Sequence, residues 1–403
     1  MTPSRPAPSV RHVETPYLHP LRLATAGAAL IATCYGIARF AYGLFVPVLR
    51  QEFDLDAATA GLIASSSYTA YCIAIVVSMV VTGRVAPRRV AVMAGALATA
   101  GTALIASATD TATLSIGVVV AGASTGVASP PLAEAVAHRI GPGHRDRVQS
   151  VVNAGTGVGV MLSGPIALAA GAHWRPAWIV FALIALAVTA WNAWAVPPDI
   201  PRTERGGAPS LLPTPLLAPG AVRMLAAAVA MGAASSAVWT FGRDIVITEG
   251  GASPVASTFM WVCLGAAGVL GAFAGDIAAR TGLGRSWGGT MLALGAATAG
   301  LALMTGSSAA VIVSAAAFGV FYTVLTGLLL LWGIRLYPNA PSFGVGSSFL
   351  MIAAGQAVGA PLVGVASDLW SPVTAFGLAA GAAALGALLR PRSALGPGPV
   401  GIR

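Results

Sequence analysis

The sequence predicts an all-α integral membrane protein whose twelve transmembrane helices form two pseudo-symmetric six-helix bundles. Apolar stretches of membrane-spanning length recur along nearly the whole 403-residue chain, and short arginine-marked loops separate them. The hydrocarbon core of a bilayer is about 30 Å thick, so each helical crossing needs roughly 20 apolar residues. Six stretches lie on each side of a polar, proline-rich segment. Together they use almost all of the chain and leave no room for a soluble domain.

The composition excludes several other classes of protein. Only 9% of the residues are charged and 56% are hydrophobic, whereas an ordinary soluble domain has about 25% charged residues. The net charge of +9 gives no basic run in a soluble module, so we expect no nucleic-acid partner. Cys34, Cys72 and Cys263 lie in three different apolar stretches, which fits neither a disulfide framework nor a metal site. We expect no metal and no cofactor.

Apolar length and helix breakers place the individual helices. In the first half we expect helices over residues 24–48, 59–81, 90–108, 113–136, 149–170 and 176–196. In the second half we expect them over 222–242, 255–276, 287–305, 309–333, 343–366 and 372–389. The predicted domain order is a disordered cytoplasmic tail (1–21), the first bundle (22–197), a cytoplasmic linker (198–220), the second bundle (221–390) and a cytoplasmic tail (391–403).

The arginines predict the orientation, because positively charged loops stay in the cytoplasm. If both termini are cytoplasmic, 18 of the 22 arginines lie in cytoplasmic segments. The outer segments then hold Arg50, Arg175 and Arg243, and Arg39 lies within the membrane. The sequence therefore predicts twelve membrane crossings with both ends in the cytoplasm.

Internal repeats support a duplication of six helices. The fifth expected helix contains Ser163-Gly164-Pro165, and the eleventh contains Gly359-Ala360-Pro361 at an equivalent place. The loops after the second and eighth helices are both glycine-led and rich in arginine. Such repeats are typical of carriers that work by alternating access.

At these loops the chain resembles the major facilitator superfamily, whose loop after the second helix combines glycine, aspartate and arginines. The loop after the eighth helix keeps Asp276 and Arg280, with the glycine-to-aspartate spacing one residue longer than usual. The loop after the second helix keeps Arg88 and Arg89 but has no aspartate. The resemblance implies that these residues help to latch a cytoplasmic gate, and the missing carboxylate puts that latch in doubt for the first half.

Two short motifs are similar to those of the bacterial YbfB/YjiJ-type branch of this superfamily. They are the stretch of residues 38–47, which contains Arg39, and the stretch 239–244, which contains Trp239. The resemblance implies two six-helix bundles around a central cavity lined mainly by the first, fourth, seventh and tenth helices.

Arg39 is the side chain least suited to face lipid. It lies 17 residues after Arg22 and 11 before Arg50, too deep in its helix to reach either surface easily. An unpaired arginine at the bilayer centre costs about 2.5–3.5 kcal/mol or more. On an α-helix Tyr35 and Tyr42 share its face, and an arginine between two phenols suits a carboxylate, a phosphate or an aromatic anion. The alternative is a structural brace that ties the first helix to neighbouring carbonyls.

Proton coupling needs a titratable group with alternating exposure. Glu134, near the inner end of the fourth helix, is the best candidate, and the alternative is a gate salt bridge with an inner-loop arginine. Arg243 and Asp244 are expected to pair with each other at the outer mouth. Trp239, Tyr322 and Gln356 are further candidates for substrate contact, with ordinary helix packing as the alternative. Four more residues are expected to form helix hinges: Pro130, Pro131, Gly164 and Pro165.

These observations predict a monomeric secondary active transporter that moves a small organic molecule, anionic or aromatic in character, across the bilayer, with protons as the coupling ion. The alternative is a non-transporting membrane sensor or scaffold with a degenerate carrier fold. An enzyme is not expected, because the sequence has no His-rich cluster, no HExxH motif and no convincing nucleophile–base set. ATP-driven transport is disfavoured, since a chain without lysine has no Walker A motif.

Overall fold

The computed structural model describes residues 20–82, 85–141, 144–171, 173–196, 215–338 and 340–391, and all of its regular structure is helical. The first half contains α1 (Pro20–Ile31), η1 (Ala32–Phe40), α2 (Ala41–Glu52), α3 (Ala57–Thr82), α4 (Pro87–Ala106), α5 (Thr111–Arg139), α6 (Arg145–Ala170) and α7 (Trp174–Ala195). The second half contains α8 (Ala221–Thr248), α9 (Pro254–Gly268), η4 (Val269–Phe273), α10 (Ala274–Thr281), α11 (Leu283–Leu303), α12 (Ser308–Leu336), α13 (Pro341–Leu369) and α14 (Pro372–Leu388).

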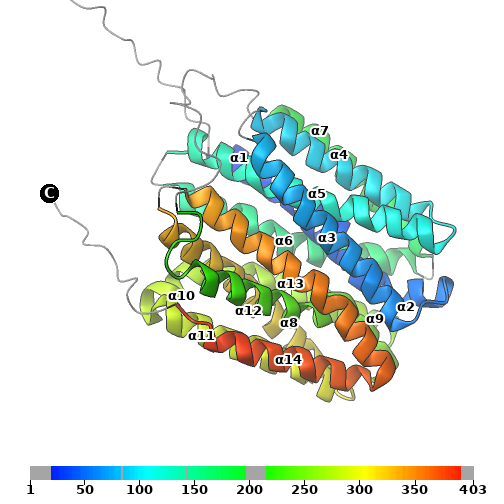
Figure 1. The fold of residues 1–403 in the computed structure, drawn as a ribbon. Coiled ribbons are helices and arrows are strands. Elements are labelled where there is room, and N and C mark those ends of the chain that lie inside the picture. Colours follow the sequence, from blue (N-terminus) through cyan, green and yellow to red (C-terminus); the bar gives the residue numbers. More distant parts are fainter. Residues whose placement is uncertain are drawn as a thin grey trace, which may run out of the picture.

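Consecutive helices run up and down the molecule, and the two halves lie side by side (Figure 1). The segments α1–η1–α2 and α9–η4–α10 are each one continuous rod, so the described chain crosses the bundle twelve times. Ten of these rods are long and apolar enough to cross a membrane, and α14 is a shorter apolar helix. This confirms the predicted fold class. The predicted tails and linker lie largely outside the described residues.

The bundle has two ends, each marked by an arginine near a helix terminus. We call the end where α2 stops and α3 begins the Arg50 end, and the opposite end, where α1 begins, the Arg22 end. The described chain starts and finishes at the Arg22 end, because an even number of rods separates Pro20 from Leu388.

Most helix starts at the Arg50 end carry their own caps. The side chains of Asp110, Ser253, Ser307 and Ser371 each accept a hydrogen bond from a backbone N–H three residues further on. Such caps satisfy donors that the first helical turn leaves open. The bonds from the backbone and side chain of Thr113 also hold the pKa of the Asp110 carboxyl below its usual value.

The first rod contains a long π-helical segment that the sequence did not predict. All nine residues of η1 are buried, and Arg39 lies near its end. The backbone N–H of Ala41 bonds to the carbonyl of Gly36, five residues back, as a π-helix requires. Insertions of this kind are frequent at functional sites, because they re-aim side chains relative to a regular α-helix.

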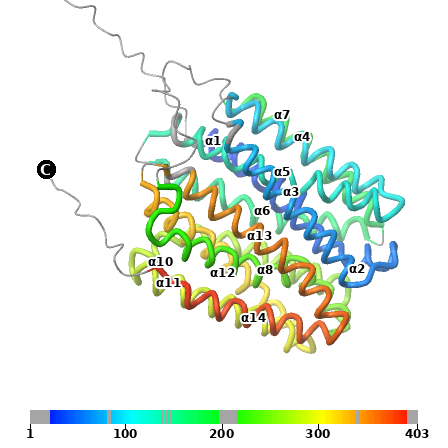
Figure 2. The backbone as a smooth tube through the Cα atoms, viewed as in Figure 1, coloured from blue at the N-terminus to red at the C-terminus, as the bar shows by residue number. Residues whose placement is uncertain are grey.

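The two halves make most of their contacts along three helix pairs: α2 with α8, α3 with α13, and α6 with α9. Figure 2 shows α3 and α13 running next to each other across the middle of the molecule. Small residues allow this close approach. A Cβ atom added at Gly43 on α2 would overlap the carbonyl oxygen of Trp239 on α8, and one added at Gly61 on α3 would overlap that of Ala360 on α13.

Candidate functional site

Arg39 is buried at the interface between the halves, with only 5% of its surface exposed. Its Nη2 donates a hydrogen bond to Oε1 of Gln356 on α13, which belongs to the second half. The amide Nε2 of Gln356 in turn donates to Oγ of Ser235 on α8, at 3.3 Å. No carboxylate pairs with Arg39 among the residues that the structure describes.

Aromatic rings surround the Arg39 guanidinium in place of a counter-ion. Its central carbon lies 4.7 Å from the ring centre of Phe40, 4.8 Å from that of Tyr68 and 4.7 Å from that of Tyr71, and Tyr35 is 5.9 Å away. Ring faces carry partial negative charge, so each contact stabilises the cation. Four neutral rings therefore supply part of the stabilisation of the buried charge that a carboxylate would otherwise give.

The second half contributes its own rings to the same place. Trp239 on α8 stacks on Phe40 with ring centres 3.9 Å apart, and it meets the edge of Tyr322 on α12 at 5.1 Å. Phe318, one turn before Tyr322, lies 5.7 Å from Trp239. We call the residues Tyr35, Arg39, Phe40, Tyr68, Tyr71, Trp239, Phe318, Tyr322 and Gln356 the Arg39 cage.

Two hydrogen-bond donors of the cage have no acceptor. Nε of Arg39 and Nε1 of Trp239 are both buried without a partner. A buried polar group left unpaired costs about 1–3 kcal/mol, and more when it is charged. Both unpaired groups are donors, so an acceptor atom placed beside either of them would satisfy it.

Hydrogen bonds fix the phenols of the first half. The hydroxyl of Tyr35 lies 2.7 Å from the hydroxyl of Ser129 on α5 and 3.3 Å from that of Tyr71. The hydroxyl of Tyr68 is 3.4 Å from that of Thr240 on α8, which links the halves again. These bonds hold the rings of Tyr35, Tyr68 and Tyr71 in place.

Tyr42 points away from the cage. Its hydroxyl donates to the backbone carbonyl of Ala60 on α3, at 3.0 Å. The expectation that Tyr42 shares a face with Arg39 assumed an α-helix between them. In the structure the π-helical segment ends at Phe40, between the two residues, and Tyr42 lies in the first turn of α2.

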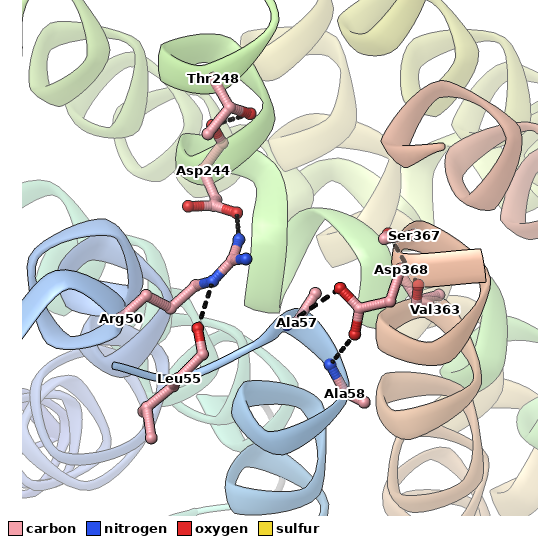
Figure 3. Close-up of polar contacts among 9 residues, drawn as sticks. All are labelled: Arg50, Leu55, Ala57, Ala58, Asp244, Thr248, Val363, Ser367 and Asp368. Atoms are coloured by element: carbon pink, nitrogen blue, oxygen red, sulfur yellow. Dashed lines mark hydrogen bonds and ion pairs between the residues drawn. The ribbon is translucent and has the colours of Figure 1, made fainter. Parts of the chain in front are cut away.

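A second polar cluster joins the halves at the Arg50 end (Figure 3). Arg50 on α2 forms an ion pair with Asp244 on α8, and its Nε also donates to the carbonyl of Leu55 at 3.2 Å. Asp368 on α13 accepts hydrogen bonds from the backbone N–H groups of Ala57, at 3.2 Å, and Ala58, at 2.7 Å. The carboxylate of one half therefore caps the first turn of α3 in the other half. We call these contacts the Arg50 latch.

The expected pairing of Arg243 with Asp244 is wrong. Arg243 donates to the carbonyl of Leu44 at 2.6 Å and to Oγ of Ser257 at 3.1 Å, while Asp244 pairs with Arg50. Successive residues of a helix point in different directions, so neighbours in sequence seldom pair with each other. Both residues nevertheless lie at the interface, because Arg50 and Leu44 belong to the first half.

A cavity of about 200 Å³ lies beside the latch. Its walls include the latch residues Arg50, Ala57, Asp244 and Asp368, with Phe241 and Phe376 as the aromatic members. The two halves therefore meet here through polar contacts around an open space, and the packing is not continuous.

Comparisons with known proteins agree with this architecture. The family model described as Major Facilitator Superfamily matches residues 28–353. The chain belongs to the major facilitator superfamily. Among proteins of curated function, none matches the sequence. The fold is similar to the crystal structure of a point mutant of the nucleoside transporter NupG, with a TM-score of 0.70 over 92% of this chain and 98% of that one. The two sequences are 13% identical, so this likeness concerns the fold alone.

The gate residues expected from the superfamily loops lie at the Arg22 end. Asp276 and Arg280 are exposed on the short helix α10, and Arg88 and Arg89 are in the first turn of α4. Glu134 is partly buried near the end of α5 and has an interaction partner. Gly83 and Arg84 of the first superfamily loop lie outside the described residues.

The residues expected as hinges lie within regular helices. α5 continues through Pro130 and Pro131, and α6 continues through Gly164 and Pro165. Proline cannot donate to the carbonyl four residues back, so Pro131 frees the carbonyl of Val127. The hydroxyl of Ser78 on α3 donates to that carbonyl at 3.3 Å.

Sequence reasoning missed Tyr68 and Tyr71, which supply half of the rings around Arg39. Their signal was a pair of tyrosines three residues apart after three serines in an apolar helix. It also missed the Arg50 latch, because Arg50, Asp244 and Asp368 lie on three rods and their pairing depends on how the halves dock.

Proposed function

We propose that this protein is a secondary active transporter that moves a small organic molecule across a bacterial inner membrane by alternating access, coupled to protons. The observation that carries the proposal is Arg39: a buried cation at the interface of two halves, with an unpaired donor and no counter-ion among the described residues. A group this costly to bury marks a substrate or ion pathway in membrane proteins. We also assign the chain to the YbfB/YjiJ-type branch.

The orientation follows from the arginines. Arg88, Arg139, Arg145, Arg280 and Arg335 all lie toward the Arg22 end. By the positive-inside rule this end faces the cytoplasm, and the Arg50 end faces outward. The Arg50 latch is then an outer gate, which is closed in this conformation.

Alternating access requires that this gate open when the inner side closes. Polar bridges suit that task. When the halves separate, water takes the place of the lost partner in the ion pair and in the helix cap at the Arg50 end. Most of the substrate contacts, by contrast, lie deeper, in the Arg39 cage. The distance between cage and latch along the first rod, from Phe40 to Arg50, is roughly 15 Å at 1.5 Å per residue.

A proteoliposome assay tests the proposal. The purified protein is reconstituted with a pH-sensitive dye inside the vesicles, and pools of organic anions, cations and neutral compounds are added. We expect one pool to trigger proton movement and Arg39→Ala to abolish it, with the variant still eluting as a folded monomer. If Glu134 carries the proton, Glu134→Gln separates substrate movement from pH. Silence of folded protein in every pool would contradict the proposal and favour a sensor or scaffold.

A further inference from the structure

We propose that the ligand of the Arg39 cage is a planar organic monoanion, an aromatic or conjugated carboxylate. Its carboxylate takes the position that the amide oxygen of Gln356 holds in this conformation. The inference rests on the proposed transport function and names the substrate class of the same site. Four features of the cage support it: the unpaired donors, the charge, the rings and the bridge through Gln356.

The unpaired donors require acceptor atoms. Nε of Arg39 and Nε1 of Trp239 lie on opposite halves, and both are buried without a partner. Arg39 exposes 5% of its surface and Trp239 exposes 3%. A guanidinium presents its donors as a planar fork that matches the two oxygens of a carboxylate. A carboxylate at Arg39 therefore satisfies Nε together with Nη2.

The charge of the cage limits the ligand to one negative charge. The groups that face Arg39 are neutral on every packed element: Tyr35 and Phe40 on its own helix, Tyr68 and Tyr71 on α3, Tyr322 on α12 and Gln356 on α13. A monoanion neutralises the cation. A dianion such as a phosphate monoester would bring a second charge, for which the described cage has no second cation.

The rings favour a planar ligand. Phe40 and Trp239 already form a stacked pair across the two halves, and Tyr322 and Phe318 border it. Stacked or edge-on aromatic pairs are worth about 0.5–1.5 kcal/mol beyond the area they bury. A flat acid gains these contacts while its carboxylate reaches Arg39, whereas a puckered acid of equal volume does not.

In this conformation the side chain of Gln356 occupies the place proposed for the ligand carboxylate. Its amide oxygen is a neutral acceptor in the place of a carboxylate oxygen, and its Nε2 is anchored on Ser235. Because Arg39 and Gln356 belong to different halves, a ligand that displaces Gln356 breaks a bridge between them. Ligand binding is then coupled to the contact between the halves.

A binding experiment with four related probes tests the inference. Full-length protein in detergent is titrated with benzoate, its neutral isostere benzamide, the non-planar cyclohexanecarboxylate and the cation benzylammonium. We expect benzoate to bind at least about tenfold more tightly than each of the others, a difference of about 1.4 kcal/mol. A panel of larger planar aromatic acids extends the series.

Variants assign the effect to named atoms. Arg39→Gln should remove the preference for benzoate over benzamide. Gln356→Glu supplies a built-in carboxylate and should abolish benzoate binding, whereas Gln356→Ala removes the competitor and should strengthen it several-fold. Gln149→Glu on α6 and Arg285→Gln on α11 are matched controls far from the cage and should change nothing.

Several outcomes overturn the inference. They are equal binding of benzoate and benzamide, unchanged benzoate binding by Arg39→Gln, or no binding by any planar acid. Should Arg39→Gln fail to fold, Gln356→Glu tests in its place whether the carboxylate of benzoate binds at Arg39. The proposed transport function fails separately: benzoate that binds in the predicted order but never crosses proteoliposomes contradicts transport and keeps the ligand class. Transport of a neutral or cationic solute by a protein that binds no acid would contradict the ligand class and keep the transport function.

Discussion

Asp244 on α8 pairs with Arg50 on α2. Arg50 is the one cation among the described residues that line the cavity at the Arg50 end, and it is thus bound to the second half. The side chains are 10% and 26% exposed, which shields the pair from solvent more than an ordinary surface ion pair. The pair stabilises the conformation in which the two halves touch at this end. It makes no direct contribution to the packing within either half.

Asp244→Asn should therefore open the Arg50 end without unfolding the protein. A hydrogen bond to a charged group contributes about 1.5–3 kcal/mol, so the open state should gain population by roughly tenfold or more. The reporter is Ser367→Cys, a near-isosteric change in the cavity wall, in a parent whose three native cysteines are replaced by alanine. The measurement is the rate of maleimide labelling in reconstituted vesicles.

Glu52→Gln is the matched control for this experiment. Glu52 pairs with Arg175 at 2.9 Å, and both residues belong to the first half. Its loss removes an arginine–carboxylate pair without touching the contact between halves. An equal rise in labelling for Glu52→Gln and Asp244→Asn would show that the Arg50 latch does not hold the halves together.

Gly43→Ala should also disfavour closure at the Arg50 end, by a steric route. The new Cβ would overlap the backbone oxygen of Trp239, and backbone cannot move aside as a side-chain tip can. Overpacking of a close contact typically costs about 1–3 kcal/mol, so we expect faster Ser367→Cys labelling and reduced transport turnover. Gly377→Ala and Gly381→Ala on α14, where an added Cβ meets open space, should leave both unchanged. Unaltered labelling in Gly43→Ala would contradict the close approach of α2 and α8.

Arg39→Lys should fail as a conservative replacement. Lysine keeps the charge but offers a point-like ammonium in place of a planar fork, so it cannot hold Gln356 and also present a second donor in the geometry of Nε. Loss of one charge-assisted hydrogen bond, about 1.5–3 kcal/mol, should lower transport roughly tenfold to a hundredfold. The measurement is initial uptake by proteoliposomes at equal protein content. Full activity of Arg39→Lys would reduce the role of Arg39 to charge alone.

The helical rods could be predicted from the sequence because apolar length reports directly on a bilayer crossing. The importance of Arg39 was also predictable, since its cost depends only on its depth in the helix. Its surroundings were predictable only in part. Tyr35, Trp239, Tyr322 and Gln356 were named from the sequence and lie in the cage, whereas Tyr68 and Tyr71, which reach Arg39 from another helix, were not. Tyr42 was expected beside Arg39 and instead bonds to the carbonyl of Ala60. Hydropathy says nothing of the register in which one helix meets another, so Arg50 and Asp244 could not be paired in advance.

Pro361 creates a further link between the halves. It lacks an N–H, so the carbonyl of Ala357 loses its partner within α13. The hydroxyl of Ser65 on α3 donates to that carbonyl at 2.6 Å, across the interface. The same arrangement of Ser78, Val127 and Pro131 operates inside the first half. Serine on α3 thus compensates for proline on two neighbouring helices, one in each half.

Ser65→Ala should consequently weaken the contact between α3 and α13. Side-chain hydrogen bonds between membrane helices contribute on average about 0.6 kcal/mol and at most about 1.7 kcal/mol. Because Pro361 has no N–H to offer the carbonyl of Ala357, we expect the bond from Ser65 to lie toward the upper value. The measurement is the free energy of unfolding in mixed micelles. Ser66→Ala is the control, because Ser66 donates to the carbonyl of Ile63 in its own helix. In a Pro361→Ala background the restored N–H serves Ala357, so the cost of Ser65→Ala should fall to that of Ser66→Ala. An unchanged cost in that background would mean that Ser65 acts through packing and not through the carbonyl that Pro361 frees.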